Sequence, residues 1–277
     1  MSRYRTSIGS SDENTITLLG HDLPGELMGR VGFGELVFWL VAMRRPTPGE
    51  LRLFEAVLMA LADHGFTPAA ITARLTLTSA PESYQGALSA GLLGGGSRFH
   101  GAAEDCARFL SHAHAEGLDA PEAVAARRHI PGLGHPVHTN GDPRTPVIYQ
   151  IAREEGLYGK HMRFLEEVAA CRPDESINGA GACGAALADL HFPVEVMRGF
   201  ALLACTAGLL GHLAEEQRRP IGSDIYRDIE QSADHLDPEE QVEVPVGHGE
   251  GAEHGAGVAH AERGGRHAPR GELDDRG

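Results

Sequence analysis

Two Thr-Pro pairs constrain the fold of this chain most strongly, because each pair stands where a helix begins. In residues 47–65, TPGELRLFEAVLMALADHG, Thr47 is placed as a helix N-cap, Pro48 takes the first helical position and Glu50 completes a capping box. Gly65 is placed to end the segment. The apolar residues between these signals recur at helical spacing; they are Leu51, Phe54, Leu58 and Leu61. The segment therefore predicts an amphipathic helix.

Further helices are indicated along the chain. Thr67 and Pro68 repeat the same start signal, and residues 81–93, PESYQGALSAGLL, form a third helical segment. Alternation of apolar and polar residues, which is typical of strands, is hardly seen. Aromatic residues make up 5% of a chain rich in alanine, leucine and glycine, so close helix contacts at small residues are expected. We predict an all-α fold.

Length and charge limit the classes of partner. The 277 residues, 42% of them hydrophobic, suffice for one large domain or two modest ones. A formal net charge of −15 argues against a nucleic acid or an anionic membrane as the main partner, because both need clustered positive charge. The N-terminal residues carry no apolar segment typical of a secretory signal, so we expect a cytoplasmic protein.

The cysteines and the most apolar segment indicate buried positions. The four cysteines are widely spaced and favour reduced, buried thiols over disulfides or a zinc site; they are Cys106, Cys171, Cys183 and Cys205. In residues 193–219, Arg198 and His212 bound an uncharged stretch of about a dozen residues, well below the ~20 that a membrane span needs. We expect a buried helix there that packs through its small residues, including across a subunit interface.

The C-terminal residues 237–277 differ in composition from the rest of the chain. They are rich in Gly, Glu and His and nearly lack large apolar residues, so we predict a disordered, acidic tail. Its histidines lack the spacing of ligands on a defined element, which favours a solvated tail over a metal site; they are His248, His254, His260 and His267. We expect no metal site.

A loop rich in glycine and proline carries the first candidate site. Residues 130–145, IPGLGHPVHTNGDPRT, place His135 between glycines, where backbone can approach a ligand closely. Arg144, nine residues later, can hold a carboxylate with its guanidinium. The loop therefore predicts a binding site for an acid, although such loops are more often structural than catalytic.

Four blocks in this sequence resemble those of the citrate synthase superfamily and follow one another in the family's order. They are ADHG at 62–65, SAGLLGGGSRFHGA at 89–102, GLGHPVHTNGDPR at 132–144 and AGLLGHLAEE at 207–216. The similarity covers about residues 15–232 and is closest to the citryl-CoA lyase branch, which includes the C-terminal domain of ATP-citrate lyase.

The resemblance implies a mostly helical homodimer with two domains and an active site between them. The large domain would comprise residues 1–100 and 191–236, and the small domain residues 101–190. The site would bind a coenzyme A thioester as substrate, together with a di- or tricarboxylic acid such as oxaloacetate or citrate. No tightly bound cofactor is expected, and neither a nucleic acid nor a membrane is an expected partner.

The resemblance also assigns roles to individual residues. His100 would hydrogen-bond the thioester oxygen, His135 would polarise the keto or alkoxide oxygen of the other fragment, and Arg144 would clamp a substrate carboxylate. His64 is a further candidate for substrate binding, with hydrogen bonding to the last carbonyls of its helix as the alternative. Coenzyme A is expected to meet the loops that contain Gly94, Gly95, Gly96, Ser97, Gly132 and Gly134.

Two arginines could complete the anion site. Arg98 lies in the second block, and Arg219 follows the last long helix, where the family often brings a carboxylate-binding arginine across the dimer. Surface ion pairing is the alternative interpretation for both arginines.

Two departures from the family pattern affect catalysis. Asn178, in SING, stands where the family has an aspartate that exchanges the proton on the carbon next to the thioester, and an amide cannot accept that proton. Cys205, in ACTAG, replaces an arginine, so one carboxylate clamp is expected to be missing. Asp174 and Asp189 are alternative bases under a shifted alignment, and deamidation of Asn178 before Gly179 would restore an acid.

Two functional classes therefore stay open. The first is an enzyme of the citryl-CoA lyase or citrate synthase type, with an altered acid pocket. The second is a degenerate paralogue that binds a coenzyme A thioester or a tricarboxylate without efficient turnover, as a sensor or as the partner of an active subunit.

Overall fold

The structure is a computed structural model that describes residues 4–125 and 127–234. The predicted tail at 237–277 and its four histidines lie outside the described residues. The described residues belong to one compact unit.

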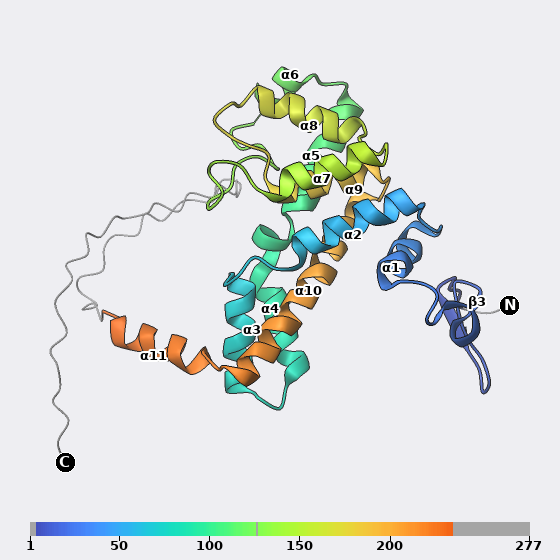
Figure 1. Cartoon of the computed structure of the whole chain (residues 1–277). Coiled ribbons are helices and arrows are strands. Elements are labelled where there is room, and N and C mark those ends of the chain that lie inside the picture. Colours follow the sequence, from blue (N-terminus) through green and yellow to red (C-terminus); the bar gives the residue numbers. More distant parts are fainter. Residues whose placement is uncertain (1–3, 126, 235–277) are drawn as a thin grey trace, which may run out of the picture. The chain divides into compact units, whose positions relative to one another are not determined.

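Helices dominate the described part of the chain (Figure 1). The eleven α-helices among the described residues are α1 (Phe33–Ala42), α2 (Pro48–Ala62), α3 (Pro68–Ser79), α4 (Tyr84–His100), α5 (Ala102–Glu116), α6 (Ala120–Ala125), α7 (Arg144–Glu154), α8 (Lys160–Ala170), α9 (Gly179–Asp189), α10 (Val194–Arg218) and α11 (Gly222–Ser232). A short π-helix, η1 (Leu23–Leu27), precedes them. The all-α prediction is confirmed.

A small antiparallel sheet near the N-terminus was not predicted. Its strands are β1 (Gly9–Ser11), β2 (Ile16–Leu18) and β3 (His21–Asp22), in the order β1-β2-β3. Gly9 pairs with Leu18 and Thr17 pairs with Asp22. The strands have two or three residues each and bury no side chain, so they show none of the alternation by which sequence reasoning finds a strand.

Both Thr-Pro helix starts are confirmed. At the start of α2 the backbone N–H of Glu50 donates to the Thr47 hydroxyl at 3.2 Å, and the Glu50 carboxylate accepts from the Thr47 N–H at 2.8 Å. At the start of α3 the Thr67 hydroxyl accepts from the Ala70 N–H at 3.4 Å. Local capping therefore fixes where these helices begin.

The buried face of α2 differs slightly from the predicted one. Its fully buried side chains are Leu53, Phe54 and Val57, whereas the predicted Leu51, Leu58 and Leu61 are half-buried. Only Phe54 is common to both sets, because the apolar stripe is wide and the face that meets the core runs along its other edge.

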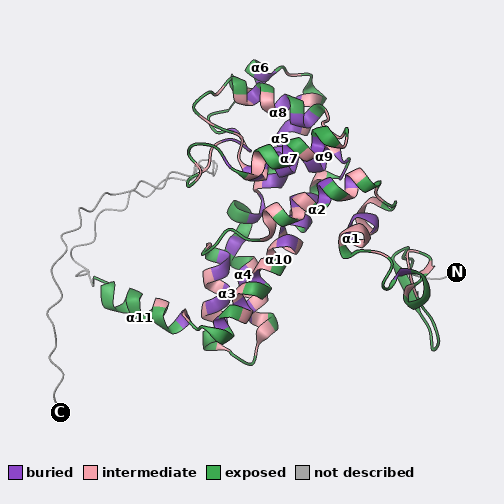
Figure 2. Cartoon of the chain, viewed as in Figure 1, coloured by how far each residue is buried: buried purple, intermediate pink, exposed green. Residues whose placement is uncertain are grey.

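The apolar interior forms two clusters (Figure 2). The larger cluster joins α1 and α2 to α5–α9 and the first part of α10, around the aromatic rings of Phe38, Phe54, Phe192 and Phe200. The smaller one lies between α3, α4 and α10, where a Cβ on Gly91 would come within 2.9 Å of the Ala73 Cβ. These clusters do not follow the predicted division at residues 101 and 190, which stays a prediction.

Helix α10 is only partly covered. It is long and apolar enough to cross a membrane by length and composition alone, and 28% of its most apolar window is buried. It packs on α2, α3, α4 and α5, so the expected buried helix is found on one face only.

The four cysteines form no disulfide. Cys106 and Cys183 are buried as expected and Cys205 is half-buried, but Cys171 is exposed because it caps the end of α8 at the surface.

Candidate functional site

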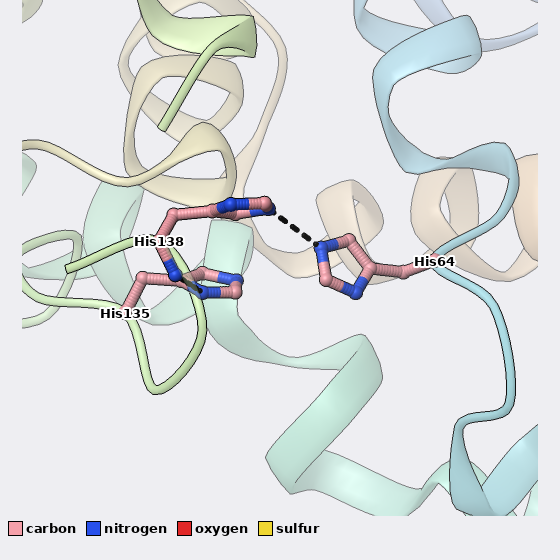
Figure 3. A group of neighbouring side chains, drawn as sticks. All are labelled: His64, His135 and His138. Atoms are coloured by element: carbon pink, nitrogen blue, oxygen red, sulfur yellow. Dashed lines mark hydrogen bonds between the residues drawn. The ribbon is translucent and has the colours of Figure 1, made fainter. Parts of the chain in front are cut away.

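Three histidines from two segments meet beside the predicted acid-binding loop (Figure 3). His64 follows α2, whereas His135 and His138 belong to the loop between α6 and α7. His64 Nε2 lies 3.2 Å from His138 Nε2, and the ring centroids of His135 and His138 are 4.5 Å apart. We call these residues the histidine cluster. The structure thus brings the predicted His64 and His135 together and adds His138.

Backbone hydrogen bonds fix the orientation of the His135 ring. Its Nδ1 accepts from the backbone N–H groups of Val137 at 3.1 Å and His138 at 3.0 Å. An imidazole that accepts at Nδ1 carries its proton on Nε2. Burial lowers the pKa of His135, and the neighbouring His138 lowers it further. The ring is therefore a neutral donor, suited to polarise an oxygen.

The ring nitrogens of the histidine cluster are close enough together to bind a metal ion, but the protonation of His135 is not that of a metal ligand. One ring nitrogen of each residue lies within 4.8 Å of the other two. A histidine that binds a metal normally donates its other N–H to a carbonyl or a carboxylate. Nδ1 of His135 instead accepts two N–H groups, which leaves a proton, rather than a lone pair, on Nε2. This arrangement suits an oxygen ligand better than a cation.

Asn178 attaches the loop to the start of α9. Its Nδ2 donates to the Gly134 carbonyl at 2.7 Å, and its Oδ1 accepts from the Gly181 N–H at 2.8 Å as the N-cap of α9. The Asn178 N–H donates to the Gly132 carbonyl at 2.9 Å. Gly132 and Gly134 have φ of +95° and +70°, where other residues are strained. Both ends of the amide are used, and a carboxylate could not make the donated bond.

Arg144 is held by a buried carboxylate. Its Nε and Nη2 donate to Asp142 at 3.0 and 2.7 Å, and its Nη1 donates to the Ala60 carbonyl at 2.9 Å. Burial alone would raise the pKa of Asp142, but bonds from Arg144 and from the Gly179 N–H hold it well below its usual range. One N–H on each Nη of Arg144 remains for the predicted carboxylate.

His100 lies at the end of α4, beyond a kink at Gly96. The side chain is buried, and Nε2 has no hydrogen-bond partner among the described residues. Burial lowers the pKa of His100; a hydrogen bond to the Leu92 backbone opposes this change, and the guanidinium of Arg198 adds to it. A Cβ on Gly95 would overlap His100 Nε2, so the ring rests against the backbone of its own helix. His100 is thus a neutral imidazole with one unused ring nitrogen.

The other predicted residues are spread along α4 and α10. A Cβ on Gly94 would meet Thr72, and the Ser97 hydroxyl accepts from Arg198 at 3.2 Å. Arg98 and Arg219 are exposed, and within residues 4–125 and 127–234 neither guanidinium makes an ion pair. Burial raises the pKa of the Cys205 thiol, and the Asp63 carboxylate raises it further. Among the described residues, no hydrogen bond or ring contact joins His100 to the histidine cluster.

The two alternative bases lie in different settings. Asp174 is exposed in the turn before α9. The Asp189 side chain is 4% exposed and accepts from the backbone N–H groups of His161 at 2.9 Å and Met162 at 3.0 Å, which caps α8. Its carboxylate therefore has a structural task.

Sequence reasoning missed three residues of this region. Asp142 stands next to Arg144 in the loop, and the DPR tripeptide could have indicated it as the partner of the arginine. His138 also lies in the quoted loop, but irregular backbone predicts no side-chain direction. Arg198 bonds Glu104, 94 residues away in sequence, and no local signal indicates that contact.

The family model and the solved structures that this chain matches agree with one another. A family model described as citrate synthase, C-terminal domain, matches residues 24–228. The solved citryl-CoA lyase from Hydrogenobacter thermophilus is 29% identical with a TM-score of 0.72, covering 87% of this chain and 94% of that chain. ATP citrate lyase from Methanothrix soehngenii, in complex with citrate and coenzyme A, is 25% identical with a TM-score of 0.71, covering 87% of this chain and 42% of that one.

Curated relatives are longer than this chain. ATP-citrate synthase subunit 1 of Sordaria macrospora is 27% identical over 241 residues, which are 78% of this chain and 36% of the relative. The chain therefore spans little more than a third of that relative's length. The TM-scores above confirm the helical fold that the sequence blocks implied.

Proposed function

Because this chain belongs to the citrate synthase family, we propose that it makes or breaks the carbon–carbon bond between an acyl-CoA and a keto acid. Acetyl-CoA and oxaloacetate, joined as a citryl thioester, are the expected pair. The solved citryl-CoA lyase supports this choice because the similarity covers 94% of that chain. The complex of ATP citrate lyase with citrate and coenzyme A supports the same two ligand classes.

The His135 loop carries the proposal. Nδ1 of His135 is occupied by two backbone N–H groups, so Nε2–H is a fixed, neutral donor. Such a donor stabilises the charge that grows on the keto or alkoxide oxygen as the carbon–carbon bond changes. Arg144 keeps free N–H groups on the same loop for a substrate carboxylate. His100, neutral and unpartnered at Nε2, is the proposed donor to the thioester oxygen.

We propose a homodimer as the working form. Much of α10 is uncovered, and the exposed Val196 and Leu210 add to an apolar face on it. A second copy of the chain would bury this face, which is costly to leave in water. The cytoplasmic location expected from the sequence stays a prediction.

The test compares the wild-type protein with Asn178→Asp. Each is incubated with citryl-CoA, or with acetyl-CoA and oxaloacetate, while loss of thioester or release of coenzyme A is followed. We expect wild-type turnover at enzymatic rates. An inactive wild-type protein that gains activity with Asn178→Asp would favour a binder without turnover, and failure of both proteins to bind any coenzyme A ester in a thermal-shift assay would contradict the whole proposal.

A further inference from the structure

We propose that His138 is a catalytic residue of this chain, which pairs with His64 to take and return the proton of the oxygen that His135 polarises. The inference rests on the proposed function and deepens it. Neither the sequence blocks nor the relatives assign a task to His138.

The spacing of the histidine cluster fits an oxygen atom. Three points that lie within 4.8 Å of one another fit inside a circle whose radius is 4.8 Å divided by √3. An oxygen at its centre is therefore no more than about 2.8 Å from each ring nitrogen, which is the length of a hydrogen bond. Figure 3 shows His64 facing the stacked rings of His135 and His138, with the hydrogen bond between His64 and His138 drawn as a dashed line.

The protons in the cluster also match those of a hydroxyl group. His135 offers one N–H, since its Nδ1 is occupied by backbone donors. The 3.2 Å contact between His64 Nε2 and His138 Nε2 requires one proton and one lone pair between the two rings. When an oxygen atom takes the place of this contact, the cluster presents two N–H donors and one acceptor. A hydroxyl accepts twice and donates once, so each group finds a partner.

The proton transfer balances in the cleavage direction. With the hydroxyl in place of the His64–His138 contact, its proton moves to the Nε2 that carries the lone pair, and the oxygen becomes the carbonyl of the keto acid. The electron pair of the broken carbon–carbon bond enters the enolate of the acyl thioester. The enolate carbon takes a proton from water, and the pair returns its proton to solvent through His64, which is exposed. The reverse steps serve synthesis.

This oxygen chemistry does not need a carboxylate at position 178. The aspartate of the family pattern acts on a proton bound to carbon, whereas the pair acts on a proton bound to oxygen. The amide of Asn178 instead holds the loop that carries both His135 and His138, through its bond to Gly134. An asparagine at position 178 and a catalytic His138 can therefore belong to the same site.

The ionisable groups around the pair have other partners. His135 is the ring that faces His138, and its own pKa responds to Asp142 and Arg144 as well as to the two other histidines. On the other side, the Asp63 carboxylate accepts from His212 Nε2 at 2.8 Å rather than from the His64 ring. The Asp63 carboxylate also bonds the His64 backbone, but no carboxylate bonds the ring of His64 or of His138 within the part of the chain that the structure describes. Protonation of the pair at low pH therefore removes the only acceptor.

The experiment measures turnover of citryl-CoA by His138→Gln, with His112→Gln, an exposed histidine on α5, as the matched control. We expect kcat of His138→Gln to fall about 10²- to 10⁴-fold with KM changed less than threefold, because a positioned acid–base group contributes that much. The fall of kcat/KM toward low pH should be lost or displaced in this variant. Imidazole added to His138→Ala should restore part of kcat. His112→Gln should behave like the wild type.

Several results would overturn the inference while leaving the proposed function intact. One is His138→Gln with wild-type kcat, or a loss confined to KM. Another is wild-type activity that EDTA abolishes and zinc restores, which would make the cluster a metal site. Wild-type protein without any turnover would overturn the proposed function, and the inference with it. A ¹⁵N NMR titration adds a readout free of turnover: His138→Gln should move the titration of His64, and an unmoved titration contradicts the pairing.

Discussion

His135 and His100, the proposed donors to the two substrate oxygens, are positioned by opposite means. His135 lies in a loop that hydrogen bonds hold in place. Backbone N–H groups of the loop donate to the His135 ring, Asn178 donates to a loop carbonyl, and Asp142 of the loop accepts from the first N–H of α9. His100 lies at a helix end that is fixed by close packing, with its ring against the Gly95 backbone and Nε2 without a partner.

This difference indicates which substitutions the loop and the helix end tolerate. A hydrogen-bonded loop loses about 1 kcal/mol for each neutral bond removed, and more where a buried group is left unpaired. A packed helix end is sensitive to a single added methyl group, since protein interiors hold few voids. In the loop, substitutions that remove a hydrogen bond should therefore cost most stability. At the end of α4, substitutions that add volume should cost most.

Substitution Gly95→Ala should have the largest effect. The new Cβ would overlap the ring of His100, so the ring must leave its position. We expect turnover of citryl-CoA to fall about 10²- to 10³-fold, as when one oxyanion donor is lost, and the protein to lose about 1–3 kcal/mol of stability from overpacking. Steady-state kinetics and urea unfolding measure the two effects.

The control for this substitution is Gly32→Ala at the N-cap of α1, where nothing lies within 4 Å of the added Cβ. It should leave turnover unchanged and change stability by less than about 1 kcal/mol, because alanine caps a helix somewhat less well than glycine. Equal kinetics for Gly95→Ala and the wild type would show that His100 is not positioned by packing.

On the loop side, Asp142→Asn should have the largest effect. The Asp142 side chain is fully buried and accepts from Arg144 and from Gly179. Its neutral replacement leaves the Arg144 charge unpaired, at a cost of about 3 kcal/mol. We place the loss at the low end of the known range because 24% of the Arg144 side chain is exposed. Chemical unfolding at pH 7 measures it.

The effect of Asp142→Asn should depend on pH. The pKa of Asp142 is lowered in the folded state, so its contribution is present above the pKa of an unfolded aspartate, about 4, and is lost as pH falls further. The stabilities of the wild type and the variant should therefore begin to approach each other below about pH 4 and meet only as pH falls through the lowered folded-state pKa of Asp142. Asp224→Asn removes an exposed ion pair with Arg227 and should change stability by less than about 0.5 kcal/mol. A pH-independent gap for Asp142→Asn would contradict the ion-pair explanation.

Local signals account for the parts of the fold that the sequence predicted. The starts of α2 and α3 depend on contacts over three residues, so Thr47 and Thr67 suffice to find them. The strands near the N-terminus could not be predicted, because they bury no side chain and so show no alternation. The buried edge of α2 could not be predicted either, because it depends on helices that are far away in sequence.

In the candidate site too, local sequence predicted some residues, whereas others depend on contacts between distant segments. The loop with His135 and Arg144 could be found from its glycines and its resemblance to a family. The contact of His64 with His138 joins residues 74 positions apart, and that of Asn178 with Gly134 spans 44 positions. Such contacts depend on the packed fold. For this reason Asn178 could be identified as a departure from the family pattern, while its task in holding the loop could not.

Asn178→Asp tests the hydrogen bonds of the loop more gently than Asp142→Asn. The carboxylate can still cap α9 through the Gly181 N–H, and a negative charge at a helix start is favourable by about 0.3–1 kcal/mol. It cannot donate to the Gly134 carbonyl, which costs about 1–3 kcal/mol. We expect a net loss of about 1 kcal/mol by urea unfolding. Asn178→Ser, which keeps a capping oxygen, separates the two terms, and a stabilised Asn178→Asp would show that the Gly134 bond contributes little.

Ser97→Ala should have the smallest effect and tests the helix side. The Ser97 hydroxyl accepts from Arg198 at 3.2 Å, but both groups reach solvent and Arg198 keeps a 2.6 Å bond to Glu104. Because water replaces an exposed hydrogen bond, the loss in stability should stay within about 0.5 kcal/mol. The kcat for citryl-CoA should also be unchanged, since Arg198 still lowers the pKa of His100, whereas a raised KM would mark Ser97 as a contact of coenzyme A. A larger loss in kcat for Ser97→Ala would show that hydrogen bonding, as well as packing, positions His100, and the contrast between the two histidines would then narrow.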